Sequence, residues 1–201
     1  MGEPQRTAGT DGLDTQAMVR RTAVHQDLAG MCAVLDQVMP LFDEDNVITV
    51  TSRRGADRPL KDCVGWLPEG VRERDFRVIN PEFRGTAIEE LLGKLPFEFG
   101  RTRLMRMPKK SCLSIHWDTS LRYHYAIVTN PACYLVFMDG DIGHFRHVPA
   151  DGYLYQMDAR LTHTAINASR EPRYHLVICD ARDEGLIDGR PEKYAALKPS
   201  R

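Results

Sequence analysis

The chain has 201 residues, of which 42% are hydrophobic and 27% charged, so it carries enough apolar material for one domain with a buried core. Its 27 Lys and Arg residues against 28 Asp and Glu residues leave a formal charge of -1. This balance lacks the basic excess that phosphate backbones select, and we expect no nucleic acid as the primary partner.

The use of cysteine and of apolar residues favours a cytoplasmic protein without a membrane span. The five cysteines are irregularly spaced and form no C-x-x-C pair, which argues against a disulfide framework and against a Cys-rich zinc site. No apolar run approaches the roughly 18 residues that cross a bilayer, and the segment 1–16 lacks the apolar core of a signal peptide.

The chain divides into a tail and a single domain. Residues 1–14 are rich in Gly, Thr, Asp and Pro and have no apolar periodicity, which predicts a flexible tail. The domain over 15–201 is expected to have a part made of helices and loops over 15–96, followed by a β-rich core over 97–181.

Helical spacing of apolar residues in the first part predicts an amphipathic helix from Thr15 to Met39 and a second helix from Gly85 to Leu95. Between them we expect a strand at Ile48–Thr51 and a long charged loop from Arg53 to Phe83. Loops of this length are often binding lids, and Trp66 either covers a site or packs on the core.

After Pro96, short apolar runs alternate with turn residues at intervals of about 10 residues, which predicts eight strands. We expect these strands over 101–107, 112–118, 122–129, 133–138, 144–148, 152–157, 163–167 and 173–180. Eight short strands in about 80 residues predict a mainly β fold, a sandwich or a barrel, with the two helices bracing one outer face.

Three residues of this β region can form a metal site. In a strand, the side chains of His116 and Asp118 point to the same face and Trp117 points to the other. His163 begins a later strand and can complete a facial triad of two histidines and one carboxylate, which leaves positions open for non-haem Fe(II) chemistry. The spacing alone is weak evidence, because a single His-x-Asp is usually coincidence.

Arg173 strengthens this interpretation. It stands ten residues after His163, at the start of the next predicted strand. A guanidinium that faces inward is costly to bury unless an anion accompanies it, and its planar fork matches a carboxylate. An iron triad together with an inward Arg suits a dicarboxylic keto acid, which describes 2-oxoglutarate.

At this point the sequence resembles a known family, the aspartyl/asparaginyl β-hydroxylases among the Fe(II)- and 2-oxoglutarate-dependent oxygenases, and within it the small bacterial members such as the cis-hydroxylases of free proline. The resemblance is close over residues 116–180 and looser from about Gly100. Two segments carry it, namely Arg122-Tyr123-His124 with Val128-Thr129-Asn130, and the series His163, Asn167, Arg173, His175 and Asp180.

The resemblance implies a double-stranded β-helix, similar to jelly rolls and cupins. It implies iron on His116, Asp118 and His163, and the distal carboxylate of 2-oxoglutarate on Arg173. It further implies that His124 contacts the keto-acid end and that Arg122 contacts cosubstrate or substrate. The presence of Asp118 places the chain nearer the bacterial branch, since the animal enzymes lack the carboxylate ligand of iron. The serine that contacts 2-oxoglutarate in the animal enzymes has no match in Leu104–Met107.

The expected activity is therefore a dioxygenase reaction. Fe(II), 2-oxoglutarate and O2 are the expected cofactors and cosubstrates, with ascorbate as a reductant in vitro, and succinate and CO2 are the expected products. The substrate is a small molecule or a peptide, and the polar candidates Arg122, Arg106 and His175 suggest that it bears a carboxylate. Its identity and the oligomeric state are left open. Two alternatives are a non-catalytic cupin-like module that binds a metal or a carboxylate, and another metal-dependent enzyme on the same barrel.

Several side chains have alternative interpretations. Arg122-Tyr123-His124 recurs as Arg173-Tyr174-His175, and in a strand the Arg and His of each copy share one face while the Tyr takes the other. Both copies can be inward polar pairs, or the Arg and His can lie on solvated faces while the tyrosines pack in the core. His175 can also replace His163 as the metal ligand, although Arg173 would then lie too close to the metal. We also single out residues with a structural or surface role as the alternative, namely His25, Arg103, Arg106, His144, His147 and Asn167.

Overall fold

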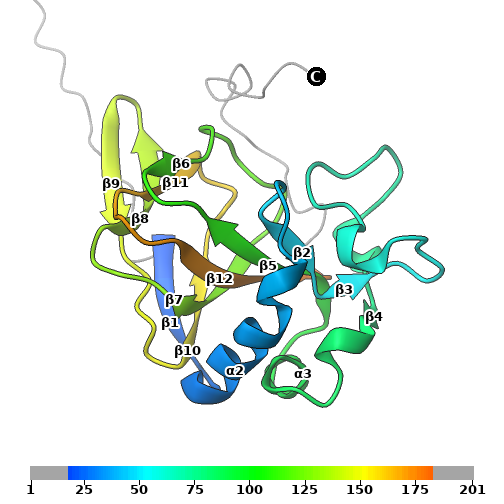
Figure 1. Ribbon diagram of the computed structural model, residues 1–201. Coiled ribbons are helices and arrows are strands. Elements are labelled where there is room, and N and C mark those ends of the chain that lie inside the picture. The colour runs from blue at the N-terminus through cyan, green and yellow to red at the C-terminus, as the bar shows by residue number, and fades with distance from the viewer. Residues whose placement is uncertain (1–17, 183–201) are drawn as a thin grey trace, which may run out of the picture.

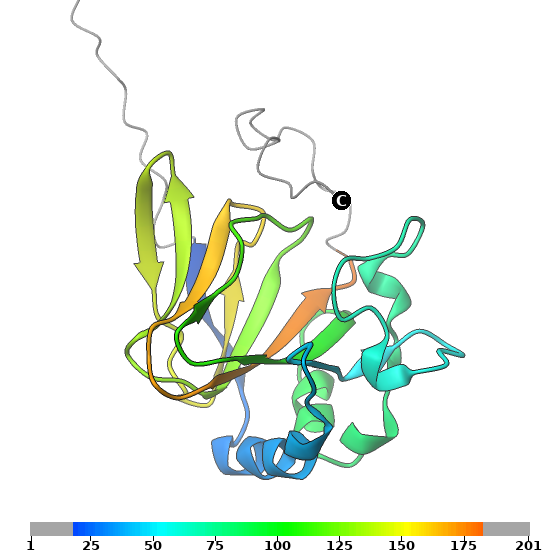
Figure 2. The same ribbon diagram turned by 45° about the horizontal axis from the view of Figure 1, so that its top comes forward.

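The computed structural model describes residues 18–182. Two antiparallel sheets face each other, and from residue 99 on the chain passes back and forth between them, with one hairpin inside the smaller sheet, in the manner of a double-stranded β-helix (Figures 1 and 2). The fold is mainly β, as the sequence predicts. None of the helices among these residues is long and apolar enough to cross a bilayer.

The larger sheet has six strands in the order β1-β10-β7-β12-β5-β2. Their bounds are β1 Val19–His25, β10 Tyr153–Met157, β7 Arg122–Val128, β12 Arg173–Asp180, β5 Phe99–Met107 and β2 Val47–Thr49. The central strand β12 pairs with β7 on one side and with β5 on the other. The three strands that carry the predicted arginine and histidine motifs therefore lie side by side.

The smaller sheet has four strands in the order β6-β11-β8-β9. Their bounds are β6 Ser111–Cys112, β11 His163–Asn167, β8 Cys133–Asp139 and β9 Ile142–Arg146, and a separate pair consists of β3 Thr51–Ser52 and β4 Val78–Ile79. Beyond the end of β6, an isolated β-bridge between His116 and His163 continues the pairing of this part of the chain with β11.

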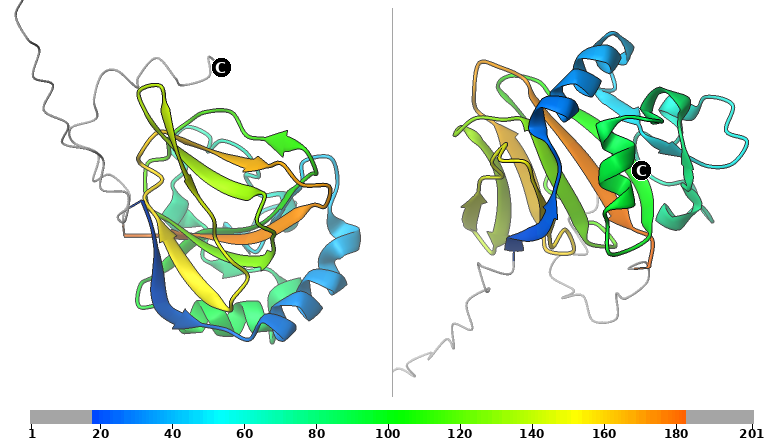
Figure 3. Two further views of the ribbon diagram at one scale, coloured as in Figure 1. Left: turned by 90° about the vertical axis from the view of Figure 1, so that its left-hand side faces the viewer. Right: turned by 90° about the horizontal axis from the view of Figure 1, so that it is seen from below.

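The helices cover the outer face of the larger sheet (Figure 3). The α-helices are α2 Leu28–Val38 and α3 Ala87–Gly93, and short 3-10 helices are η1 Met39–Leu41, η2 Pro59–Lys61, η3 Glu73–Asp75 and η4 Pro81–Phe83. The side chains of Asp27 and Thr86 cap α2 and α3 by accepting hydrogen bonds from backbone N–H groups of the first turn. The expected bracing of one outer face by helices is confirmed.

The repeated Arg-Tyr-His motif separates two apolar cores. Tyr123 and Tyr125 of β7, with Tyr174 of β12, pack toward the helices in the larger core, while Ala126 belongs to the smaller core between the sheets. The arginines and histidines of the motif alternate with these residues, so they point between the sheets. The inward orientation of both polar pairs is therefore the one that the structure shows.

The predicted helix over Thr15–Met39 is wrong in its first half. Val19–His25 forms the edge strand β1, which pairs with β10, and only Leu28–Val38 is helical; residues 15–17 lie outside the described part. Val19, Thr22 and Val24 are β-branched residues, which favour strands, and pairing with β10 satisfies their backbone groups. The spacing of apolar residues in this stretch fits the period of a strand as well as that of a helix.

The predicted strand over 112–118 is also wrong. Only Ser111–Cys112 is strand, and the rest is an irregular connection held by single hydrogen bonds to the smaller sheet, such as that from Leu113 N to Ala165 O (3.0 Å). Trp117 consequently lines the cavity between the sheets and does not point away from it. Near Ile48–Thr51 the predicted strand is broken into β2 and β3, and β9 begins and ends two residues before the predicted strand 144–148.

The long segment 53–83 lies against β5 at one point. The backbone of Glu73 passes so close to Gly100 that a Cβ at position 100 would lie 2.6 Å from the carbonyl oxygen of Glu73. Glycine at this position thus permits the segment to approach the strand, and the preceding residues reach the mouth of the cavity.

Candidate active site

A cavity of about 690 Å³ opens between the two sheets. Its wall is formed by strands of both sheets and by two connecting segments, 65–73 and 113–119. Trp66, on the first of these segments, lies at the cavity and is 64% exposed, so it does not pack in the core. The cavity wall contains the three residues of the predicted metal triad, His116, Asp118 and His163.

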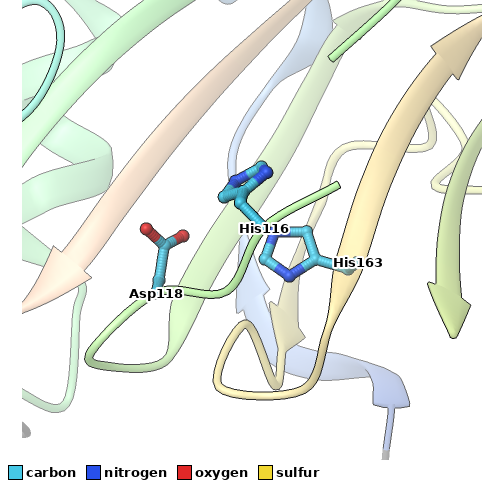
Figure 4. Close-up of side chains that lie close together, drawn as sticks. All are labelled: His116, Asp118 and His163. Carbon is cyan, nitrogen blue, oxygen red and sulfur yellow. The ribbon is translucent and has the colours of Figure 1, made fainter. Parts of the chain in front are cut away.

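His116, Asp118 and His163 converge on one point of this wall (Figure 4). Their candidate ligand atoms all lie within 4.8 Å of one another. His163 begins β11, and reciprocal backbone hydrogen bonds of 2.7 and 2.9 Å join it to His116. The backbone N–H of Asp118 donates to Ala159 O (2.8 Å), which holds the third residue beside the bridge.

Both imidazoles present the same ring nitrogen to the shared point. Nδ1 of His116 lies 2.7 Å from Ser114 O and Nδ1 of His163 lies 2.8 Å from Leu161 O. A carbonyl oxygen only accepts, so Nδ1 carries the proton in each ring and the lone pair of Nε2 is available for a metal ion. This outer-shell arrangement is typical of metal-binding histidines.

The electrostatics keep these ligands in the forms that bind a cation. Burial raises the pKa of Asp118, but Arg122, with a smaller contribution from His163, outweighs it and lowers this pKa to about 2. Burial lowers the pKa of His163 to about 4. At neutral pH the site therefore offers a carboxylate and a neutral imidazole, as metal coordination requires.

Arg122 forms ion pairs with two acidic side chains of the protein. Its Nη2 lies 2.9 Å from Oε1 of Glu73 and 3.2 Å from Oδ1 of Asp118, and its Nη1 also bonds Ser120. Glu73, which is 1% exposed, pairs in addition with Arg101 at 2.8 Å. Arg122 thus connects the segment before β4 with the candidate metal ligand.

The network around Glu73 was not expected from the sequence. Glu73 stands in the charged run Arg72–Arg77, which has the composition of a solvated loop. Glu73 differs from the other charged residues of this run in its burial and in its two distant arginine partners. Neither property can be predicted from the neighbouring residues in the sequence.

Arg173 has a different environment. It lines the cavity with 4% exposure, its Nε has no hydrogen-bond partner, and among residues 18–182 no acidic side chain forms an ion pair with it. Burial lowers its pKa to about 10, so it remains charged at neutral pH. A buried guanidinium without a counter-ion is costly, which fits a site for an anion.

Arg103 also faces the cavity, whereas Arg106 does not. Arg103 is 9% exposed, its Nε has no partner, and its Nη1 makes one long bond of 3.4 Å to Val64 O. Arg106 points away from this cavity, where it bonds Asn46 Oδ1 at 2.6 Å and Asp43 O at 2.8 Å. Of the two strand arginines, only Arg103 can therefore meet a ligand between the sheets.

His124 lines the cavity, and His175 lies behind it. Their Nδ1 atoms are 3.4 Å apart, and burial lowers the pKa of His124 to about 3 and that of His175 well below its usual value. His175 is not part of the metal-ligand cluster, which contains His163.

The remaining candidates lie outside the cavity wall. Asn167 is fully buried and binds the backbone of the turn between β11 and β12, where its Nδ2 donates to Glu171 O (2.8 Å). His25 ends β1 and packs edge-to-face on Tyr153. His147 is exposed, and its Nδ1 lies 2.9 Å from Cys133 O. His144 is half-buried on β9.

The fold and the site together define a double-stranded β-helix protein with a candidate metal centre between its sheets. Residues 86–183 match the profile of the aspartyl/asparaginyl beta-hydroxylase family. The family resemblance that the sequence predicts is therefore confirmed over these residues.

Several solved structures are similar to this chain. A 2OG-Fe(II) oxygenase family oxidoreductase from Burkholderia pseudomallei has 15% identity and a TM-score of 0.49, with 78% of this chain and 79% of that chain covered. A prolyl-4-hydroxylase from Pseudomonas putida has 12% identity and a TM-score of 0.49, with 82% and 92% covered. A cupin domain from Bordetella pertussis has 17% identity and a TM-score of 0.34, with 43% and 86% covered. No curated protein sequence matches the chain.

Proposed function

We propose that this protein is an Fe(II)- and 2-oxoglutarate-dependent dioxygenase. It hydroxylates a C–H bond of an amino acid, a peptidyl side chain or another small polar molecule that bears a carboxylate, and it releases succinate and CO2. The observation that carries the proposal is the combination, in one cavity, of a His-Asp-His cluster with free Nε2 lone pairs and a buried arginine without a counter-ion.

The residues present fit the metal and the cosubstrate. His116, Asp118 and His163 would hold Fe(II) as a facial triad, the ligand set that leaves open positions for non-haem iron oxygenases. Arg173 would hold the distal carboxylate of 2-oxoglutarate through its planar fork. When bound, the iron supplies the activation of O2 with oxidative decarboxylation of the keto acid, which side chains cannot perform.

The charge of the cavity wall supports an anionic substrate as well. The cavity is lined by four buried arginines (Arg101, Arg103, Arg122 and Arg173), by the exposed Arg72 and by three acidic side chains (Glu69, Glu73 and Asp118), and a bound divalent cation increases the positive excess. Arg101 and Arg122 are neutralised by Glu73 and Asp118. With Arg173 assigned to the cosubstrate, Arg103 is the side chain left to bind a carboxylate of the substrate.

The segment 65–73 would contribute by covering the cavity. Its residues form one side of the wall, and the ion pairs of Glu73 fix its end beside the metal ligands. Exclusion of water strengthens the charge interactions inside such a site and limits turnover without substrate.

The proposal is tested by a screen of the twenty amino acids and short peptides with Fe(II), ascorbate and 2-oxoglutarate. The expected result is a product that has gained one oxygen, with one succinate formed per product. Metal binding without any succinate would favour the non-catalytic alternative, and turnover without 2-oxoglutarate would favour another metal-dependent enzyme.

The role of Arg173 has its own test. Arg173→Ala is expected to raise the 2-oxoglutarate concentration for half-maximal turnover by roughly 100-fold, about 3 kcal/mol, because the fork to the distal carboxylate is lost. Iron affinity should stay unchanged, as it should in Arg170→Ala, a control at an exposed arginine in the turn before β12. A variant that uses 2-oxoglutarate as well as the wild type does would contradict the assignment.

A further inference from the structure

Two buried histidines, one lining the cavity and one behind it, form a pair that the proposed reaction does not yet use. His124 on β7 and His175 on β12 lie on adjacent strands, and their rings meet edge-to-face with centroids 5.7 Å apart. They are 6% and 2% exposed, and their Nδ1 atoms are 3.4 Å apart. The pair is therefore joined through one ring nitrogen of each residue.

Both rings are neutral. Burial is the largest cause that lowers the pKa of each, and the charge of Arg173 lowers both further. A neutral imidazole carries one N–H and one lone pair. The contact therefore requires one Nδ1 to donate and the other to accept. Which of the two residues donates determines whether the neutral ring of His124 carries its proton on Nδ1 or on Nε2.

The second nitrogen of His175 decides between the two arrangements. Its Nε2 is sealed from solvent and has no hydrogen-bond partner. If His124 donated, His175 Nε2 would carry a buried N–H without an acceptor, which is rare in proteins, and it would do so near the positive charge of Arg173. If His175 donates, its Nε2 holds only a lone pair, which a nearby cation favours.

We propose that His175 is a positioning residue that donates from Nδ1 to His124 Nδ1 and thereby keeps His124 in its Nε2–H form, a hydrogen-bond donor to an anionic oxygen of 2-oxoglutarate. His124 lines the cavity, and Nε2 is the ring nitrogen that the pair leaves unused. A lone pair at this place would repel a keto-acid dianion, whereas an N–H binds it. This inference rests on the proposed function for the identity of the anion, and on the structure for the state of the ring.

The state of the ring is measured directly by NMR. The metal-free chain is labelled with 15N-histidine, and the signals of His124 are assigned by their loss in His124→Gln. The expected spectrum shows a proton on Nε2 and a hydrogen-bonded lone pair on Nδ1 of His124. In His175→Phe, which keeps a ring but cannot donate, Nδ1 should lose its hydrogen-bonded shift. A proton on Nδ1 of His124 in the wild type would overturn the inference.

Cosubstrate binding gives the second measurement. Equilibrium dialysis of 2-oxoglutarate against the Zn(II)-loaded chain, which cannot turn over, should show a Kd at least 10-fold higher for His175→Phe. His175→Gln, whose amide can donate to His124, should return the Kd to within about threefold of the wild type. Zinc affinity should not change in either variant, and His25→Gln, an exposed histidine on β1, should behave as the wild type.

The outcomes separate this inference from the proposed function. If the wild type does not bind 2-oxoglutarate, the proposed function fails, and the role of His175 toward that ligand fails with it, although the NMR result for the ring remains valid. If the wild type binds 2-oxoglutarate and His175→Phe binds it equally well, only the role of His175 is wrong. Failure of His175→Gln to restore binding would show that shape and not donation matters, which also overturns the inference.

Discussion

The candidate metal ligands are oriented by their own neighbours in the chain. In each case the imidazole Nδ1 contacts the carbonyl oxygen of the residue two positions earlier, Ser114 for His116 and Leu161 for His163. The backbone bridge between the two histidines then fixes the distance between their rings. Ligand orientation therefore depends on short-range geometry, and ligand convergence depends on the pairing of two distant segments.

Replacement of either histidine tests the site at the level of the residue. His116→Ala and His163→Ala are each expected to weaken the binding of Fe(II) or of Zn(II) by at least roughly 100-fold, because a three-ligand site loses one ligand. Isothermal titration of the metal-free chain measures this, with circular dichroism to verify that the fold is intact. His144→Ala, outside the site on β9, serves as the control. Unchanged metal affinity in both variants would exclude this triad.

The segment 53–83, which has only short 3-10 helices and the two-residue strand β4, is fixed by buried ion pairs and a close backbone contact. Its most deeply buried acid, Glu73, reaches Arg101 on β5 and Arg122 on β7, and Gly100 permits its backbone to lie against β5. Burial raises the pKa of Glu73, but Arg122 and Arg101 outweigh it and hold this pKa below its usual value. The charged carboxylate thus anchors the segment to two central strands.

Glu73→Ala is expected to destabilise the protein by about 3–5 kcal/mol, since two buried guanidinium groups lose their shared partner. Urea unfolding measures the change. Glu82→Ala, an exposed acid in η4, should change the free energy of unfolding by less than about 0.5 kcal/mol. Equal effects of the two substitutions would mean that the ion pairs of Glu73 contribute nothing beyond surface charge.

The strand β1 shows why one element was assigned wrongly. Its exposure alternates only in part, and Arg20 and Arg21 on its outer positions interrupt any regular pattern. Nothing in Val19–His25 excludes a helix that continues into α2. Its pairing with β10, more than 120 residues later in the chain, decides the outcome.

At the scale of the whole molecule, one sheet serves two cores. The outward residues of β7 and β12 pack under α2 and α3, while the inward residues form the cavity and the smaller core. The cavity is consequently rich in polar groups that are far from water. Burial keeps the imidazoles of His124 and His175 in the neutral form, so the free energy of unfolding is expected to depend on pH under acidic conditions.

The free energy of unfolding of the metal-free chain is expected to fall as the pH decreases from about 6.5 to 4.5. The pKa of His124 is lowered to about 3 by burial, and that of His175 is also low, whereas in the unfolded chain both take protons near pH 6.5. The unfolded state therefore binds more protons in this window, and stability rises with pH across it. The loss from His124 alone at pH 4.5 is on the order of 2–3 kcal/mol.

Urea unfolding at several pH values between 7 and 4.5 measures this dependence, and the slope against pH gives the number of protons taken up on unfolding. His175→Phe removes one buried imidazole, so its slope should be shallower by up to one proton. A free energy of unfolding that does not depend on pH in this window would show that these histidines are protonated in the folded chain.

The sequence by itself determined the local features of this protein. The alternation of Arg-Tyr-His in β7 and β12 placed the Arg and His of each motif on one face and the Tyr on the other, because successive side chains of a strand point to opposite faces. The apolar spacing predicted the helix that contains α3, and β11 and β12 have the predicted bounds. Each of these depends on residues that are close together in the chain.

Only the tertiary structure decided which charges are paired. Arg101 and Arg122 pair with Glu73 at separations of 28 and 49 residues. Within residues 18–182, by contrast, Arg173 has no acidic partner and the Nε of Arg103 has no hydrogen-bond partner. The segment 113–118 brings His116 and Asp118 together through hydrogen bonds to β11 and its preceding turn, and not through the regular alternation of a strand. Ion pairs and strand pairing are set by contacts between distant parts of the chain, and a local sequence pattern does not encode them.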